Sequence, residues 1–141
     1  MSGTAASGTA ASRPAAAQAG PELRVMAKWE EFTGWFLNHT GRWPKSARFT
    51  LTQRLENHAL DVAELLVVAR YDPRRRPRSL HRANLTLERM RHLLRLAKGA
   101  NVCPRAGFET AMRGLDECGR MLHGWRASLN PKDRRRSGLG G

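Results

Sequence analysis

Two groups of closely spaced basic side chains are the residues of this sequence best suited to bind a charged partner. Positions 42 to 55 contain no acid, and their basic residues are Arg42, Lys45, Arg48 and Arg54. In the second group a lone acid, Asp72, precedes Arg74, Arg75, Arg76, Arg78 and Arg82. Cations at this density favour phosphates, because each contact releases a condensed counterion. We therefore predict that both groups contact the phosphates of a nucleic acid without reading its base sequence.

The overall charge points to the same kind of partner. The chain has 25 Lys and Arg residues against 12 Asp and Glu residues, which gives a formal net charge of +13. An excess of this size favours a polyanion over a charge that serves solubility alone. A scaffold that binds an acidic protein is the alternative interpretation.

Polar side chains gather directly after the first basic group. Four of them are candidate residues of a partner interface: Gln53, Glu56, Asp61 and Glu64. On a helix they can form a polar network with a second protein or a second subunit. Ion pairs between helices of one chain explain the same residues equally well.

Catalytic and metal-binding signatures are missing from the sequence. A di-iron bundle needs Glu-x-x-His on two helices, whereas Glu56 lies two positions before His58 and Glu88 lies four before His92. HExxH and a Gly-rich phosphate loop after a strand are also not found. We therefore predict a protein that is not an enzyme and has no metal and no cofactor.

The cysteines and the hydropathy bear on the cellular compartment. Cys103 and Cys118 lie fifteen positions apart, outside the spacings of zinc sites, and two cysteines make no disulfide framework. This usage suits a reducing cytoplasm. No run approaches the roughly 20 apolar residues of a membrane span, and the N-terminus lacks the features of a secretory signal. We expect a cytoplasmic protein without a membrane partner.

The two ends of the chain differ in composition from its centre. Residues 1–22 repeat SGTAA and have Met1 as their one large apolar side chain, so we predict a disordered tail. Met26 opens MAKWEEFTGWF and is an alternative start to Met1. Residues 131–141 are Gly-rich and basic, and we predict that they are disordered too. One domain, residues 23–130, remains between the tails.

Four helical patterns and no convincing strand lie in this domain. The predicted helices cover residues 23–38, 50–71, 79–99 and a stretch that follows Pro104. In the second, the apolar stripe is Leu51, Leu55, His58, Val62, Leu65 and Ala69, with Leu66 beside it. In the last, the stripe runs from Phe108 to Leu129 at alternating steps of three and four. Helices of this length joined by short loops predict an all-α, antiparallel up-down-up-down four-helix bundle.

This topology places the basic groups at opposite ends of the bundle. The first and third loops meet at one end, here called the first end, with residues 42–54, Lys98 and Arg105. The second loop lies at the second end, with residues 74–82 and the tail arginines 134–136. Trp43 sits in the first loop between basic residues. It either stacks on an unpaired base or, as is commoner for Trp, folds back over the end of the bundle.

The second predicted helix also resembles a known family. RFTLTQRLENHALDVAELLVVARY, with the preceding WPKSAR and the later GRMLHGWRAS, is similar to the accessory variability determinant (Avd) proteins of bacterial diversity-generating retroelements. The likeness covers roughly residues 28–129. Matching positions before and in the second helix are Pro44, Lys45, Arg48, Leu51, Gln53, Arg54, Glu56, Ala59, Leu60, Asp61 and Glu64. Those in the last helix are Gly119, Arg120, Leu122, Gly124 and Trp125. Trp43, Ala47 and His123 depart from the pattern.

The resemblance implies a fold, an assembly and partners. Avd proteins belong to a group of four-helix proteins that includes those encoded by intervening sequences in bacterial large-subunit ribosomal RNA. The implied assembly is a ring-shaped homo-oligomer, a pentamer. The implied partners are the retroelement's reverse transcriptase and its template RNA, with the cDNA as a further ligand, during mutagenic reverse transcription.

Overall fold

The computed structural model describes residues 20–129; residues 1–19 and 130–141, which hold most of the two predicted tails, lie outside it. Four α-helices make up most of the described part: α2 (Pro21–Thr40), α3 (Gln53–Tyr71), α4 (Arg76–Gly99) and α5 (Arg105–Ala127). Between α2 and α3 lie a 3-10 turn, η1 (Lys45–Ala47), and a π-helical segment, η2 (Arg48–Thr52). Residues 20–129 contain no strand, so the prediction of an all-helical fold with four helices is confirmed.

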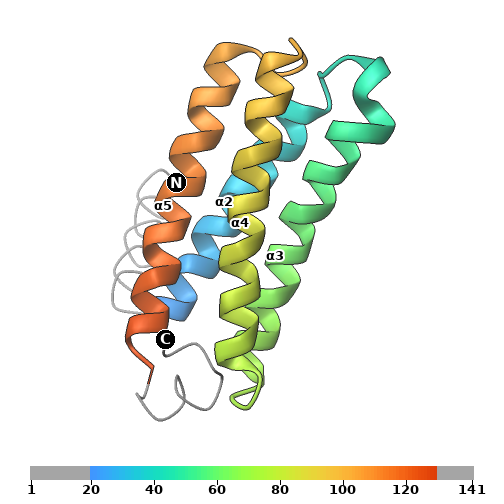
Figure 1. Cartoon of the computed structure of the whole chain (residues 1–141). Helices are drawn as coiled ribbons and strands as arrows, with labels where there is room; N and C mark the ends of the chain where they lie inside the picture. The colour runs from blue at the N-terminus through green and yellow to red at the C-terminus, as the bar shows by residue number, and fades with distance from the viewer. Residues whose placement is uncertain (1–19, 130–141) are drawn as a thin grey trace, which may run out of the picture.

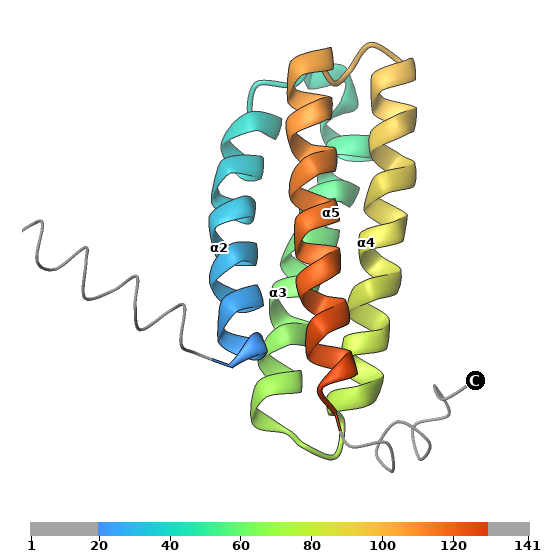
Figure 2. The same ribbon diagram turned by 90° about the vertical axis from the view of Figure 1, so that its left-hand side faces the viewer.

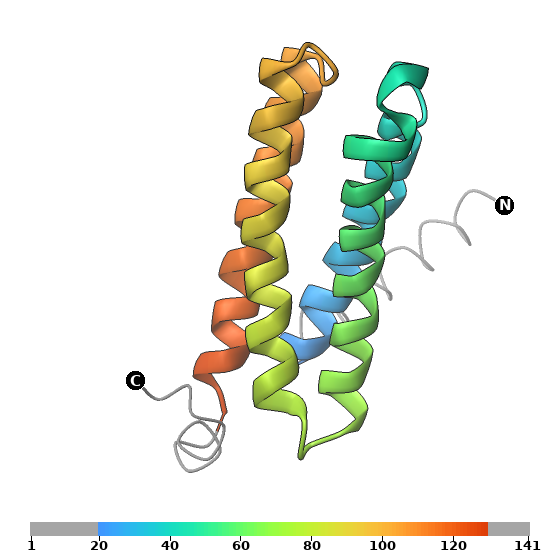
Figure 3. The ribbon, with the colours of Figure 1, turned by 45° about the vertical axis from the view of Figure 1, so that its right-hand side comes forward.

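The four helices lie side by side and enclose one core (Figures 1 and 2). Each helix packs on its neighbours in the chain, and α2 also packs on α5, so that the bundle closes. Figure 1 shows the connection between α2 and α3 and the one between α4 and α5 at the same end. The α3–α4 connection lies at the other end (Figure 3). The two basic groups therefore lie at opposite ends of α3.

Apolar residues at helical spacing form the core. Val25, Trp29, Phe32 and Phe36 of α2 are all buried, as their periodicity predicts. The indole Nε1 of Trp29 donates a hydrogen bond of 2.9 Å to the carbonyl oxygen of Ala59, which ties α2 to α3. Along α5, the buried apolar residues are Ala111, Leu115, Cys118, Leu122 and Trp125.

One predicted stripe is wrong in detail. In α3 the buried residues are Leu55, Ala59, Val62, Leu66 and Ala69. His58 and Leu65, which the sequence analysis put on the stripe, are half-buried and line a groove between α3 and α4. The core face of α3 is thus turned by about one residue toward Ala59 and Leu66.

Prolines mark two of the helix starts. Pro21 occupies the first turn of α2, so the helix begins two residues inside the segment predicted to be a tail. Pro77 stands in the first turn of α4, which begins at Arg76 and not at the predicted residue 79. Proline is tolerated there because the backbone amide of a first turn has no partner within the helix.

Candidate nucleic-acid and partner interfaces

Trp43 anchors the first end of the bundle. Its side chain is 7% exposed and packs edge-on against Phe36, with ring centroids 6.3 Å apart, and against His39 at 5.9 Å. The indole Nε1 is buried and has no hydrogen-bond partner within the described residues. Trp43 therefore folds back over the end of the bundle and does not present its ring to a base.

Arg48 and Glu56 are partners of each other. Arg48 Nη2 donates to Glu56 Oε1 at 2.6 Å, and Thr40 Oγ1 donates to Glu56 Oε2 at 2.5 Å. The side chain of Glu56 is 19% exposed. These contacts join α2, η2 and α3. They also offset the positive charge of Arg48, which was predicted to contact phosphate, with the negative charge of Glu56, which was predicted to contact a protein partner. For this pair the geometry favours the alternative of an ion pair within the chain.

The other predicted cations of the first end are open to solvent. Arg42, Lys45 and Arg54 are exposed, and none forms an ion pair with any residue of the described part. Lys98 and Arg105 come from the neighbouring α4–α5 connection. Lys98 Nζ lies 4.7 Å from the centroid of the Phe108 ring, and Arg105 pairs with Glu109 at 3.4 Å. Arg42, Lys45 and Arg54 are thus the freest cations of this end.

At the second end, the side chains of one acid and one arginine form hydrogen bonds with the backbone. Asp72 Oδ1 accepts hydrogen bonds from the amides of Arg74 and Arg75 at 3.1 and 3.3 Å, and Asp72 also pairs with the Arg75 side chain. Arg76 Nε donates to Ala69 O at 2.5 Å and its Nη2 to Arg70 O at 3.0 Å. The guanidinium of Arg76 therefore caps the C-terminus of α3.

The remaining arginines of this end point away from such contacts. Arg74, Arg78 and Arg82 are exposed and form no ion pair within residues 20–129. The tail arginines 134–136 lie outside the described residues. A stretch of positive charge thus follows the α3–α4 turn and continues up α4 to Arg82.

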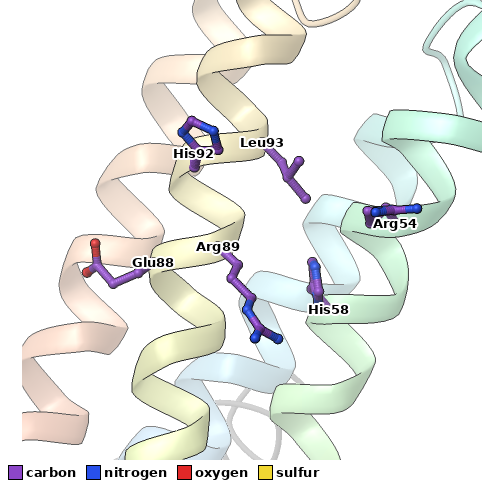
Figure 4. Close-up of a pocket in the computed structure, with 6 residues that line it drawn as sticks. All are labelled: Arg54, His58, Glu88, Arg89, His92 and Leu93. Atoms are coloured by element: carbon purple, nitrogen blue, oxygen red, sulfur yellow. The ribbon is translucent and has the colours of Figure 1, made fainter.

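A groove runs between α3 and α4. The part of the groove nearer the first end has a volume of about 620 Å³ and is lined by Arg54, His58, Glu88, Arg89, His92 and Leu93. Figure 4 shows Arg89 and Leu93 reaching from α4 toward Arg54 and His58 on α3. Burial, the main cause, lowers the pKa of His58, and nearby Asp61 opposes that shift.

A second hollow of about 400 Å³ continues the groove toward the second end. Its lining residues are Asp61, Glu64, Leu65, Val68, Arg82, Leu85, Thr86 and Arg89. The groove therefore brings together Arg54 and Arg82, predicted to bind phosphates, with Asp61 and Glu64, predicted to bind a protein. Gln53 is exposed at the start of α3 and lines neither hollow.

Sequence reasoning missed the contribution of α4 to this groove. Leu85, Arg89 and His92 are spaced by four and three positions, so they share one helix face. That spacing was readable, but only the packing of α4 on α3 shows that the face borders Asp61 and Arg54. Asp61 and Glu64 form no salt bridge or hydrogen bond with the rest of residues 20–129, which leaves both carboxylates available to a partner.

A cysteine and a histidine also lie close together near the first end. Cys103 Sγ is 3.9 Å from His39 Nε2. Burial raises the pKa of the Cys103 thiol to about 11, so it is protonated at neutral pH and a poor nucleophile. Residues 20–129 contain no group of three or more side chains able to hold a metal ion. Within the same range, each helix is too short or too polar to cross a membrane.

Comparison with known proteins adds one finding. The sequence model of a protein family described as bAvd-like matches residues 23–129, from the first turn of α2 to just past the end of α5. No curated protein matches the chain. The matched region contains both basic groups and the whole α3–α4 groove.

Proposed function

Because the chain belongs to the bAvd-like family, we propose that it is an accessory protein of a diversity-generating retroelement. In this role it holds the reverse transcriptase and the template RNA, or the cDNA made from it, while mutagenic reverse transcription proceeds. The chain itself carries no catalytic step. The free thiols of Cys103 and Cys118 suit the bacterial cytoplasm as its place of action.

The nucleic-acid role is supported by the cations that the fold leaves unpaired. Arg42, Lys45 and Arg54 at the first end and Arg74, Arg78 and Arg82 at the second are exposed and have no carboxylate partner in the described part of the chain. A surface cation without a carboxylate partner can neutralise a phosphate and release its counterion. Arg48 contributes less, because its charge is already paired with that of Glu56. This is the observation that carries the proposal.

The protein-binding role is supported by the α3–α4 groove. The charges in the middle of the groove are mixed, with Arg89 beside Asp61 and Glu64, which suits a protein surface better than a phosphate backbone. Of the large apolar residues exposed on α3 and α4, Leu85 lines the groove itself. We propose that this face binds the reverse transcriptase.

The proposed assembly is a ring-shaped homopentamer of antiparallel bundles. It rests on the family, and its physical value is multivalency. Several weakly binding basic ends held on one ring act at a high effective concentration, so that their combined affinity for one RNA greatly exceeds that of a single end.

The first experiment is co-purification with a retroelement reverse transcriptase, with and without nuclease, followed by measurement of the complex mass by light scattering. The proposal expects a nuclease-resistant complex with several copies of this chain. Separation of the proteins once nucleic acid is digested would exclude the groove as a polymerase site. It would leave an RNA-binding bundle alone.

A set of variants tests the phosphate contacts. In Arg74→Gln, Arg78→Gln, Arg82→Gln the capping Arg76 and the ion-paired Arg75 are kept, so the fold should be unaffected. The slope of log affinity against log salt should become shallower by about 2, since each phosphate contact on a single strand adds about 0.7. The matched control removes the same charge from helix flanks, by Arg95→Gln, Arg113→Gln, Arg120→Gln. If the starting protein binds no RNA, a scaffold for an acidic protein becomes the better interpretation.

A further inference from the structure

The exposed aromatic side chains of this bundle lie within its basic ends. The chain has four Trp, four Phe and one Tyr, all of them within residues 20–129. Seven are buried or half-buried. The other two are Phe49, 85% exposed beside the first basic group, and Tyr71, 73% exposed beside the second. An exposed aromatic ring does not contribute to the core. Its position among cations therefore suggests that it contacts a binding partner.

Phe49 is held outward by a fixed framework. It lies in the π-helical segment η2, and its neighbours Ala47 and Thr52 are both buried. Arg48, the residue before it, is tied to Glu56, and Thr50 Oγ1 donates to Ala47 O at 3.3 Å. π-Helical turns are rare overall, and those that occur are often found at functional sites. The ring is thus presented by anchored backbone, which lowers the entropy cost of binding.

Both faces of the Phe49 ring are free. No ring or cation of residues 20–129 stacks on it, whereas the Arg70 guanidinium already lies 5.3 Å from the Tyr71 ring centroid. The nearest charged residues along the chain are the cations Lys45, Arg48 and Arg54. The cores of protein interfaces are depleted of charge. Sites for single-stranded nucleic acid, by contrast, combine an aromatic platform with cations that follow the backbone.

We propose that Phe49 stacks on an unpaired nucleobase of a single strand whose neighbouring phosphates lie against Arg42 and Lys45. The inference rests on the proposed RNA binding and deepens it, because it makes the first end selective for unpaired bases. In a duplex the bases are stacked on each other and offer no free face to Phe49. Stacking tolerates every base, so this end still reads no sequence.

The test is fluorescence anisotropy with three labelled probes of equal strand length. They are oligouridine, the same strand without its bases, and an RNA duplex. Phe49→Ala should weaken binding to oligouridine by about 5- to 150-fold, the loss typical of one aromatic platform. Its affinity for the abasic strand and for the duplex should stay that of the unchanged protein, as should its salt slope.

Two further substitutions separate stacking from apolar contact. Phe49→Trp retains a stacking surface and should restore oligouridine affinity, while Phe49→Leu retains apolar bulk and should not. Because Phe49 is exposed, all three variants should unfold at the temperature of the original chain. Leu23→Ala, which truncates an exposed apolar residue at the start of α2, is the control and should change none of the affinities.

The outcomes distinguish this inference from the proposed function. If the unchanged protein binds none of the three probes, both fail. If it binds them and Phe49→Ala weakens all three equally, or none, RNA binding stands and base stacking is wrong. A Phe49→Ala variant that keeps its RNA affinities but loses the reverse transcriptase in co-purification would show that the ring binds protein instead.

Discussion

At each end of the bundle, the side chain of one half-buried arginine from the basic group forms hydrogen bonds that stabilise the fold, but the acceptors differ. At the first end Arg48 pairs with the carboxylate of Glu56, so its positive charge is offset. At the second end Arg76 donates to the carbonyl oxygens of Ala69 and Arg70, which are neutral acceptors. Arg76 therefore keeps a positive charge that Arg48 has offset, and at the second end the exposed pair of Arg75 with Asp72 is the one that offsets charge.

The ends also differ in what holds them rigid. The first is closed by the buried Trp43 ring, which packs on Phe36 and His39. The second is a short turn held by hydrogen bonds from backbone amides to Asp72. A dense run of arginines in a sequence is thus not a measure of charge available to a ligand, and the two ends should respond differently to substitution.

The largest expected effect follows from loss of the Trp43 ring. Trp43→Ala should lower the free energy of unfolding by about 3 to 5 kcal/mol, the range for deletion of a buried aromatic side chain. Asp72→Ala, which removes the corresponding anchor of the second end, should cost only about 1 kcal/mol, as loss of a side-chain cap does. Urea denaturation of both variants measures the difference.

Trp43→Phe is the matched control for this comparison. It keeps most of the ring and removes an indole N–H that has no acceptor within the described residues, so it should cost much less than the alanine variant. Equal losses for Trp43→Ala and Asp72→Ala would contradict the view that only the first end is anchored by the core.

The next effect concerns the cap on α3. Arg76→Ala should lower the free energy of unfolding by about 1.5 to 3 kcal/mol, because two hydrogen bonds from a charged donor are lost at a helix end. Arg75→Ala, one position away, removes an exposed ion pair with Asp72 and should cost less than about 1 kcal/mol. Thermal or urea unfolding of the two variants tests this. A larger loss of unfolding free energy for Arg75→Ala than for Arg76→Ala would rule out the capping role of Arg76.

Glu56→Gln should have opposite effects on stability and on RNA binding. The free energy of unfolding should fall by about 1 to 2 kcal/mol, since the hydrogen bonds from Arg48 and Thr40 lose the negative charge of their acceptor. The same change frees the charge of Arg48, so the salt slope of RNA binding should steepen by about 0.7. A slope that stays the same would mean that Arg48 is not within reach of the phosphates.

The elements of the fold could be predicted from the sequence because they depend on local periodicity. Val25, Trp29, Phe32 and Phe36 recur at steps that fit one helix face, and all four are buried. The limits of α4 were less readable, because Pro77 permits either a stop or a first turn. Only packing decided that α4 begins at Arg76, and this position brings the side chain of Arg76 to the end of α3.

The site was predictable at the level of residue groups but not of individual roles. Arg48 and Glu56 are eight positions apart, beyond the three or four that link side chains along a regular helix, and the π-helical segment lies between them. Trp43 and Phe49 share one basic stretch, and only Trp43 was singled out from the sequence, with folding back over the bundle end as its commoner arrangement. Trp43 is buried by contacts with Phe36 and His39 from another helix, whereas Phe49 is 85% exposed.

The smallest effect expected is a sensitivity to acid at the first end of the bundle. His39 is half-buried between Trp35 and Trp43, whereas His81 and His123, toward the second end, are exposed. Burial, and then the charge of Arg42, lowers the pKa of His39 from its ordinary value of 6.5. Below that value the unfolded chain takes up a proton that the folded chain resists, so stability is present above about pH 6.5 and falls as the pH drops.

His39→Gln isolates this contribution. Urea unfolding of the unchanged protein at about pH 8 and about pH 5.5, on either side of the ordinary histidine pKa, should show the loss at the lower pH. The variant should show a smaller loss. Part of the dependence should remain, because burial also lowers the pKa of His58 in the α3–α4 groove, and His39→Gln, His58→Gln should remove that part as well. An unchanged loss in the double variant would place the acid sensitivity outside these two histidines.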